Sequence, residues 1–200
     1  MNAQASQRPR VGILALQGGY HAHEKVLGQL GAESREVRVP AQLEDLDALI
    51  IPGGESSVMT RGVKREGLAE PLRTAARSGM PLLGTCAGMI MLDRDHLGIL
   101  DIRTTRNAFG RQLRSFEADI DVAGVQGGPL HAVFIRAPWV HEHAPHVQVL
   151  ARLDGHPVAV RQENVVAVAF HPELAGERRL HEQLLSLNGY RRPASSRSRR

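Results

Sequence analysis

Short apolar runs alternate with amphipathic segments through the first half of the chain. Runs of strand length predict strands at residues 11–17, 33–39, 47–51 and 81–85. Apolar residues at helical spacing predict helices at residues 20–30, 68–77 and 87–92. Apolar strands that alternate with amphipathic helices are typical of a parallel sheet with both faces covered. This half of the chain therefore predicts an α/β fold.

The pattern changes in the second half, where strand-like segments follow one another with little helix between them. We expect strands at residues 115–122, 131–137, 147–153, 157–162 and 165–170, and a closing helix at residues 180–187. We expect these strands to join the same sheet in mixed or antiparallel pairing. The whole pattern predicts one α/β domain at residues 10–189, a three-layer sandwich in which helices flank a central, mostly parallel sheet.

The composition is that of a globular protein, and no segment predicts a membrane anchor. Of the 200 residues, 42% are hydrophobic, and no apolar run approaches the ~20 residues that span a bilayer. A chain of this size buries roughly 70% of its unfolded surface, so it can fold without disulfides or structural metal. Residues 1–10 lack the apolar core of a signal peptide. A single cysteine forms no intrachain disulfide and suits a reducing compartment, so we expect a cytoplasmic protein.

The positive charge is concentrated at one end of the chain. The formal net charge is +4 and the pI is about 10.0, values typical of proteins that bind nucleic acids. However, residues 191–200 contain five arginines and no acid, and the rest of the chain carries 20 basic against 21 acidic residues. Residues 190–200 have no apolar periodicity and predict a disordered, solvated tail, and we expect the same of residues 1–9. We therefore expect no nucleic-acid partner.

A Gly-x-Cys-x-Gly sequence at residues 84–88 lies between a predicted strand and a predicted helix. In a nucleophile elbow, the nucleophile occupies a strained strand-to-helix turn, and its neighbours two positions away must be small. The turn also places the Cys86 thiol at a helix N-terminus, where the helix dipole and free N–H groups favour a thiolate. The alternative is that Cys86 is an ordinary buried cysteine, as most free cysteines are.

One of the ten histidines, His171, directly follows the apolar run at residues 165–170. In open α/β sheets, the carboxyl ends of parallel strands line the ligand-binding crevice, and Cys86 ends its own strand at that edge. Pro172 stiffens the turn, and Glu173 is near enough to accept a hydrogen bond from the imidazole. A strand-end histidine with an incidental acid is the alternative. Together with the elbow, the pattern favours a triad of Cys86, His171 and Glu173.

The remaining motifs give weaker signals. Residues 52–57 read Pro-Gly-Gly-Glu-Ser-Ser after a predicted strand, and the two glycines would let the backbone approach a ligand or bind an anion. An ordinary loop is the alternative, and no Gly-Lys-Ser/Thr follows that would make it a phosphate loop. Histidines cluster at residues 20–23 and in an expected loop at residues 141–146, but neither cluster has a recognised zinc spacing. We expect neither a metal nor a cofactor.

Six motifs occur in a characteristic order along the chain. They are Leu-Ala-Leu-Gln-Gly at 14–18, Pro-Gly-Gly-Glu-Ser at 52–56, Gly-Thr-Cys-Ala-Gly at 84–88, Arg-Asn-Ala-Phe-Gly-Arg-Gln at 106–112, Phe-Ile-Arg-Ala-Pro at 134–138 and Phe-His-Pro-Glu at 170–173. In this combination, residues 10–187 resemble the glutaminase subunit of the pyridoxal phosphate synthase complex, a triad-type (class I) glutamine amidotransferase. The third and last motifs fit any triad-type amidotransferase, whereas the fourth and fifth narrow the resemblance to this subunit.

The resemblance implies a flavodoxin-like fold of the class I amidotransferase type and a role for each matching residue. Cys86 would be the nucleophile, His171 its base and acid, and Glu173 the group that orients His171. The residues implied to bind glutamine are Gly54, Glu55, Ser56, Arg106, Ile135 and Arg136. We expect the backbone amides of Ala87 and of Gly53 or Gly54 to stabilise the oxyanion.

The resemblance also implies partners. The substrate would be L-glutamine, and the ammonia would pass to a barrel-shaped synthase that makes pyridoxal 5'-phosphate. Many glutaminase subunits would surround a synthase core, and their activity would depend on docking to it.

Two sequence features keep other functions open. Residues 92–95 connect the nucleophile helix almost directly to residues 96–100, where relatives usually carry a longer insertion. This short segment favours a catalytically silent subunit that only binds and regulates a partner. The other alternative is a cysteine hydrolase of the intracellular-protease-like group, but those proteins usually place His directly after the nucleophile, where this chain has Ala87.

Overall fold

The computed structural model describes residues 8–110 and 115–187. The two predicted disordered tails, residues 1–9 and 190–200, therefore lie outside the described residues, apart from Arg8 and Pro9. Pro9, which we assigned to the N-terminal tail, is buried, and its carbonyl accepts a hydrogen bond from the Glu33 N–H at 2.9 Å. Backbone pairing at this end of the sheet thus begins one residue before the first strand.

Within the described residues, seven strands form the central sheet. They are β1 (Arg10–Leu14), β2 (Glu33–Val37), β3 (Ala48–Ile51), β4 (Leu82–Thr85), β9 (Gln148–Leu153), β10 (His156–Gln162) and β11 (Val165–Val168). Their spatial order is β2-β1-β3-β4-β11-β10-β9. Pairing is parallel from β2 to β11 and antiparallel from β11 to β9. The parallel part has the flavodoxin-like order, in which ligands bind beyond the carboxyl ends of the strands.

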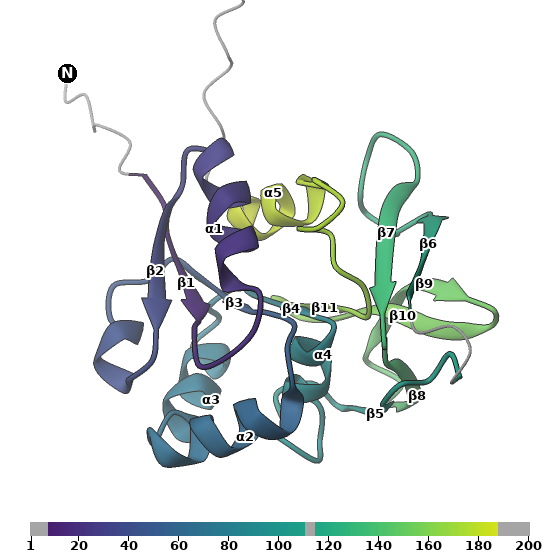
Figure 1. Cartoon of the computed structure of the whole chain (residues 1–200). Coiled ribbons are helices and arrows are strands. Elements are labelled where there is room, and N and C mark those ends of the chain that lie inside the picture. The colour runs from purple at the N-terminus through teal and green to yellow at the C-terminus, as the bar shows by residue number, and fades with distance from the viewer. Residues whose placement is uncertain (1–7, 111–114, 188–200) are drawn as a thin grey trace, which may run out of the picture.

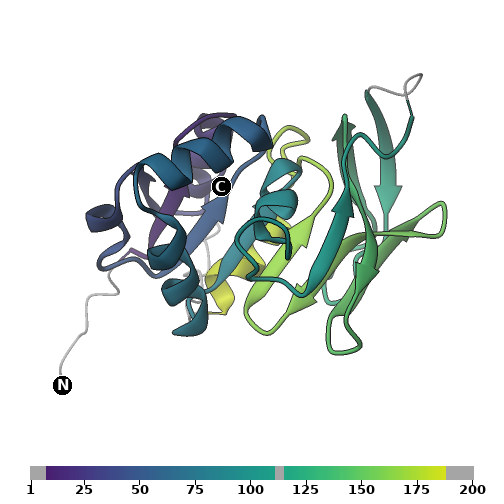
Figure 2. The ribbon, with the colours of Figure 1, turned by 90° about the horizontal axis from the view of Figure 1, so that it is seen from below.

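Helices cover both faces of this sheet (Figure 1). One face carries α1 (Tyr20–Gln29) and α5 (Arg179–Ser186). The other face, which is turned toward the viewer in Figure 2, carries α2 (Ser56–Arg65), α3 (Ala69–Arg77) and α4 (Ala87–Leu92). A short 3-10 helix, η1 (Pro40–Leu43), follows β2. The prediction of a three-layer α/β sandwich with a mostly parallel sheet is confirmed.

The central strands form this sheet because their side chains are apolar on both faces. Every residue of β3, β4 and β11 is buried, as a sheet covered on both sides requires. The helix α2 was not predicted. It buries Met59, Gly62 and Val63 at helical spacing, but its remaining residues are mostly polar and exposed, so the apolar signal in the sequence is weak.

The prediction that residues 115–122 and 131–137 join the central sheet is wrong. They form a separate antiparallel pair of β6 (Ser115–Ile120) and β7 (Leu130–Ile135). The reason is an aromatic cluster outside the sheet: Phe116 and Phe134 stack at 4.6 Å between centroids, and Phe109 meets both edge-on. An alternating pattern fixes which face of a strand is buried, but it does not identify the partner strand.

The expected loop around residues 141–146 is also partly wrong. Its first half belongs to β8 (Trp139–His143), which pairs antiparallel with β5 (Ile102–Thr105) in a third small sheet. The mixed polar and apolar side chains of both strands obscured the strand pattern, because only Ile102 and Val140 are fully buried there.

The short connection after α4 is a closely hydrogen-bonded turn. The buried Asp93 carboxylate accepts a hydrogen bond from Thr104 Oγ1 at 2.6 Å and lies 2.7 Å from Nδ1 of His96. The backbone N–H groups of Gly98 and Leu100 donate to the carbonyls of Asp93 and Leu92. These bonds join α4 to β5 through a compact connection.

Candidate active site

Cys86 lies between β4 and α4 in a backbone conformation that residues with side chains rarely adopt. Its φ is 49° and its ψ is −108°. A Cβ atom at Gly84 would lie 2.9 Å from the Gly88 carbonyl, and one at Gly88 would lie 1.9 Å from the Ile51 oxygen. Because only glycine fits at these two positions, the turn requires the Gly-x-Cys-x-Gly sequence.

His171 approaches Cys86 at the backbone of Gly53. The strands β11 and β4 run in parallel with Val168 opposite Thr85, so both end at the same edge of the sheet. A Cβ atom on Gly53 would lie 2.4 Å from Cε1 of His171 and 3.4 Å from Cβ of Cys86. The structure therefore brings together the cysteine and the histidine that the sequence assigned to one sheet edge, and Gly53 must lack a side chain for both to fit.

Glu173 lies on the other side of the imidazole. Its Oε1 is 2.7 Å from Nδ1 of His171, which leaves Nε2 for Cys86. Burial disfavours a charge on the imidazole, but hydrogen bonds with Cys86 and Glu173 outweigh this and raise the pKa of His171 to about 10. Burial also opposes a charge on Glu173, yet the His171 hydrogen bond and the nearby His23 hold the pKa of this carboxyl below its ordinary value. The geometry thus favours an imidazolium beside a carboxylate.

The loop after β3 brings three predicted glutamine-binding residues to the rim of this site. Gly54 has a φ of 152°, and a Cβ there would lie 2.4 Å from Oε1 of Gln17. The Glu55 N–H donates a hydrogen bond to the same oxygen at 2.6 Å. Ser56 is buried at the start of α2, and its hydroxyl has no partner among the described residues. The loop after β1 therefore positions the loop after β3 and leaves one buried hydroxyl unpaired.

Arg106 joins this rim from a distant part of the chain. Its Nη2 donates a hydrogen bond to Oε1 of Glu55 at 2.7 Å, and the two side chains are 47% and 38% exposed. Hydrogen bonds from Ser57, with Arg106 alongside, lower the pKa of Glu55. The pair thus places one fixed positive and one fixed negative charge at the mouth of the site, which complements the two charges of an amino-acid zwitterion.

Ile135 and Arg136 lie at the end of β7, close to the sulfur. The Ile135 carbonyl oxygen is 3.7 Å from Sγ of Cys86, and Arg136 has a positive φ of 45°. The backbone N–H of His171 donates a hydrogen bond to the Val133 carbonyl at 2.8 Å. This bond anchors β7 to the triad although β7 lies outside the central sheet.

The backbone amides expected to stabilise an oxyanion lie beside Cys86. Ala87 is the first residue of α4, so its N–H has no acceptor within the helix. Gly53 packs against Cys86 on one side and Gly18 on the other, where a Cβ atom on Gly18 would lie 1.9 Å from the Gly53 oxygen. Both predicted amides therefore belong to backbone that directly adjoins the sulfur-bearing residue.

Two further histidines lie behind Glu173, and the sequence analysis assigned neither of them to the site. His23 in α1 has Nε2 3.6 Å from Oε2 of Glu173 and 3.3 Å from Oγ1 of Thr85. Its Nδ1 is 2.9 Å from Nε2 of His181 in α5. Both rings are completely buried. A line of buried polar groups thus extends from the triad into the layer formed by α1 and α5.

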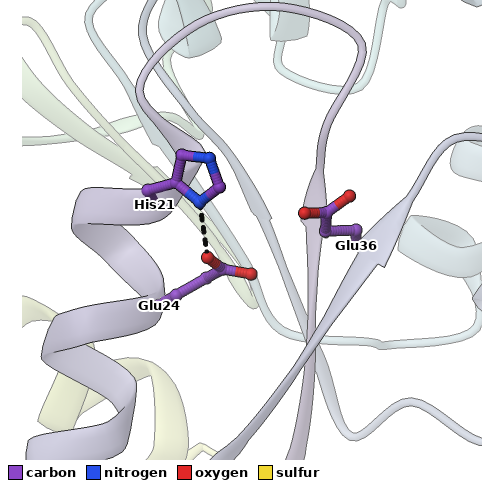
Figure 3. Close-up of side chains that lie close together, drawn as sticks. All are labelled: His21, Glu24 and Glu36. Carbon is purple, nitrogen blue, oxygen red and sulfur yellow. Dashed lines mark hydrogen bonds and ion pairs between the residues drawn. The ribbon is translucent and has the colours of Figure 1, made fainter.

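The other histidines form no convincing metal centre. Among the described residues, His21, Glu24 and Glu36 alone bring three ligand atoms within 4.8 Å of one another (Figure 3). His21 is exposed and lies 2.9 Å from Glu24, and the Arg38 guanidinium already pairs with Glu36 at 2.7 Å. Because Arg38 neutralises one of the two carboxylates, we propose no metal at this cluster.

A sequence model described as the SNO glutamine amidotransferase family matches residues 13–187. The chain belongs to this family. Similar curated proteins carry the name pyridoxal 5'-phosphate synthase subunit PdxT. The relative from Acidothermus cellulolyticus is 54% identical over 190 residues, with 88% of this chain and 92% of the relative covered. The relative from Frankia alni is 50% identical over 188 residues, with 90% and 94% covered.

A solved structure supports the assignment of this chain to the glutamine amidotransferases. The crystal structure of a glutamine amidotransferase superposes with a TM-score of 0.85 at 45% identity, over 90% of this chain and 99% of that one. In residues 8–110 and 115–187, no helix of the amidotransferase is both long and apolar enough to cross a membrane.

Proposed function

We propose that this amidotransferase hydrolyses the side-chain amide of L-glutamine to L-glutamate and ammonia, with Cys86 as nucleophile, and delivers the ammonia to a pyridoxal 5'-phosphate synthase. The approach of Cys86 and His171 at Gly53, with Glu173 on the far side of the ring, is the observation that carries the proposal. The names of the relatives support the choice of acceptor.

In the first half-reaction, the Cys86 sulfur attacks the side-chain carbonyl carbon of glutamine. The oxygen of the tetrahedral intermediate accepts hydrogen bonds from the backbone amides of Ala87 and of Gly53 or Gly54. Each such donor is typically worth about 3 to 4 kcal/mol in the transition state. The His171 imidazolium gives its proton to the amide nitrogen, the carbon–nitrogen bond breaks, and ammonia leaves a glutamyl thioester on Cys86.

In the second half-reaction, neutral His171 accepts a proton from water as the water oxygen attacks the thioester carbon. The carbon–sulfur bond then breaks, glutamate leaves, and Cys86 returns to the thiolate opposite the imidazolium. Glu173 keeps the Nδ1 side of the ring occupied through both steps, so Nε2 always faces the reacting atoms. The balance is one water consumed and one ammonia released for each glutamine.

Residues at the rim of the site bind the α-amino and α-carboxylate groups of glutamine. Arg106 or Arg136 pairs with the substrate carboxylate, because a planar guanidinium suits two parallel hydrogen bonds. Glu55 accepts hydrogen bonds from the substrate ammonium, and Gly54, Ser56 and the Ile135 backbone complete the cradle. The unpaired, buried Ser56 hydroxyl supports this assignment, since a substrate group would satisfy it.

The acceptor is proposed from the names of the relatives, and the compartment from the catalytic thiol. We propose that the synthase docks on this chain, so that ammonia is released next to its acceptor, and that turnover depends on docking. A catalytic thiol must stay reduced, which fits the cytoplasm.

Glutamine turnover with and without the synthase of the same organism tests the proposal. We expect ammonia release from the pair and a loss of at least about 10⁴-fold in Cys86→Ala with the fold retained, because removing a nucleophile leaves only binding and oxyanion effects. Ammonia release by Cys86→Ala near the wild-type rate would refute the nucleophile. Absence of turnover by the wild-type pair would favour a silent subunit, and turnover of peptides or esters instead would favour a hydrolase of the protease-like group.

A further inference from the structure

We propose that His23, supported by His181, is a positioning residue for the triad: its ring directs an N–H at the second carboxylate oxygen of Glu173 and keeps that carboxylate aligned on His171. This inference rests on the proposed function and extends the triad by two residues. Neither histidine contacts Cys86. His23 acts on the triad through Glu173, and His181 acts through His23.

The two oxygens of Glu173 are in unequal surroundings. Oε1 pairs with Nδ1 of His171 at 2.7 Å. Oε2 is buried and has no hydrogen-bond partner among the described residues, and the basic ring atom beside it is Nε2 of His23 at 3.6 Å. The Glu173 side chain is only 2% exposed. A buried carboxylate oxygen without any donor is costly, so the approach of His23 is the compensation that this pocket offers.

The hydrogen bond between the two histidines selects which ring nitrogen of His23 carries the proton. Burial lowers the pKa of both His23 and His181, so both rings are neutral and each holds one N–H. If His23 donated from Nδ1, its bare Nε2 would face the Glu173 carboxylate and repel it. If His181 donates from Nε2 instead, His23 accepts at Nδ1 and carries its proton on Nε2, pointing between Thr85 and Glu173. The second arrangement places a donor where the negative charge lies.

The unpaired nitrogen of His181 agrees with this assignment. Its Nδ1 is buried and has no partner within the described part of the chain. In the selected arrangement that atom is an unprotonated acceptor, which is less costly to leave unpaired than a buried N–H. The helices α1 and α5 lie side by side on one face of the sheet (Figure 1), so His181 and His23 approach the triad from the layer opposite α4.

The test is a set of substitutions that keep or remove the donor position in the glutaminase assay with the synthase present. His23→Gln keeps an amide nitrogen near the place of Nε2, whereas His23→Asn is too short to reach Glu173. We expect His23→Asn to lower kcat by about 10- to 100-fold, the usual cost of removing a donor to a charged group, with KM little changed. We expect His23→Gln to recover most of the loss, and His181→Gln to be milder than His181→Asn.

Two readouts separate positioning from a general loss of packing. The acid limb of the kcat–pH profile should shift to higher pH in His23→Asn and return in His23→Gln, because Glu173 becomes easier to protonate without the facing N–H. In a Glu173→Ala background, His23→Asn should cost less than about twofold, since coupled residues are not additive. His21→Asn and His21→Gln, on the exposed side of the same helix, are the matched controls and should retain wild-type turnover.

Several results would overturn the inference. A kcat of His23→Asn within twofold of wild type would do so, as would equal losses in the wild-type and Glu173→Ala backgrounds. If His23→Asn does not fold, equal kcat values and pH profiles for folded His181→Asn and His181→Gln would refute the inference that His181 and His23 align Glu173. Absence of glutamine turnover in the wild-type pair would instead refute the proposed function.

Discussion

The buried side and the rim of the site present the same kinds of charged groups in opposite surroundings. On the buried side, Glu173 is 2% exposed and lies 2.7 Å from His171. At the rim, Glu55 lies the same 2.7 Å from Arg106, but the two side chains are 38% and 47% exposed. Equal distances therefore do not imply equal energies, because water and salt screen the rim pair and barely reach the buried one.

This difference in exposure suits the two pairs to different tasks, the buried pair to catalysis and the exposed pair to substrate binding. A buried carboxylate with few partners can shift the protonation of His171 and fix its ring. An exposed ion pair contributes about 0 to 1 kcal/mol of stability and can exchange its partner for a substrate group at little cost. The rim is therefore suited to binding the zwitterionic end of glutamine, and the buried side to the proton transfers.

Replacing Glu173 and Glu55 by alanine, one at a time, should give the largest difference in kinetics between the buried side and the rim. We expect Glu173→Ala to lower kcat by about 10²- to 10³-fold, less than Cys86→Ala, because the base loses its orienting group. We expect Glu55→Ala to raise KM by about tenfold with kcat nearly unchanged, since it removes a hydrogen bond to substrate. Steady-state kinetics at saturating synthase measure both values, and a Glu55→Ala variant with the larger kcat loss would invert the assignment of the two regions.

Arg106 tests the rim by itself. We expect Arg106→Ala to raise KM for glutamine by about 5- to 20-fold and Arg106→Lys to raise it less, because lysine keeps the charge but loses the planar fork. The KM of the wild type should rise with added salt more than that of Arg106→Ala. Arg103→Ala is the matched control, since Arg103 is equally exposed at 47% and pairs with Asp95 and Glu142 instead of Glu55. A similar KM increase in both variants would remove Arg106 from the binding site.

A further predicted effect is on stability: the free energy of unfolding falls with rising pH on the alkaline side of neutrality and with falling pH on the acid side. The raised pKa of His171, about 10, contributes stability that is fully present below its unfolded value of 6.5 and is lost as pH rises through 10. Burial lowers the pKa of His181 to about 3, so its unfolded form binds a proton first, and stability falls as pH drops from 6.5 toward 3. Each such proton changes the free energy of unfolding by at most about 1.4 kcal/mol per pH unit.

Denaturant unfolding between pH 4 and pH 10 measures these slopes. His181→Gln should flatten the acid side, Cys86→Ala should flatten the alkaline side, and His21→Gln should leave both slopes unchanged. A wild-type slope unaffected by His181→Gln would show that His181 already binds a proton in the folded protein.

The parallel half of the fold was predictable because its strands are apolar throughout. The apolar runs at β3 and β4 predict strands buried on both faces, and glycine lies at or near the end of each run. In the antiparallel half, β9 and β10 were predicted in the central sheet, whereas β6 and β7 were predicted as strands but not as a separate pair, because alternation does not reveal the partner of a strand. The strands β5 and β8 were not predicted, because their mixed polar and apolar side chains give no clear pattern. The helix α2 escaped prediction since only Met59, Gly62 and Val63 of its central turns are buried.

The triad was easier to predict than its support. Cys86 and His171 both end buried strands, so parallel pairing alone predicts that they share an edge. His23 and His181 carry a signal that we did not use: each precedes buried apolar residues by three and four positions in its helix. A histidine on an apolar helix face predicts burial, but only the packing of α1 against α5 shows that the two rings meet each other and that His23 reaches Glu173. Arg106 could not be joined to Glu55 from spacing, because that contact depends on the path of the chain after β5.

An acid-quenched reaction shows whether Cys86 carries the glutamyl group during turnover. Wild-type amidotransferase with its synthase is mixed with carbon-labelled glutamine, quenched in acid within one turnover, digested, and analysed by mass spectrometry. We expect a glutamyl group on the peptide that contains residues 84–88, attached through the Cys86 sulfur and absent from Cys86→Ala. A label on a different residue, or ammonia release during the first turnover with no labelled Cys86 peptide, would contradict it.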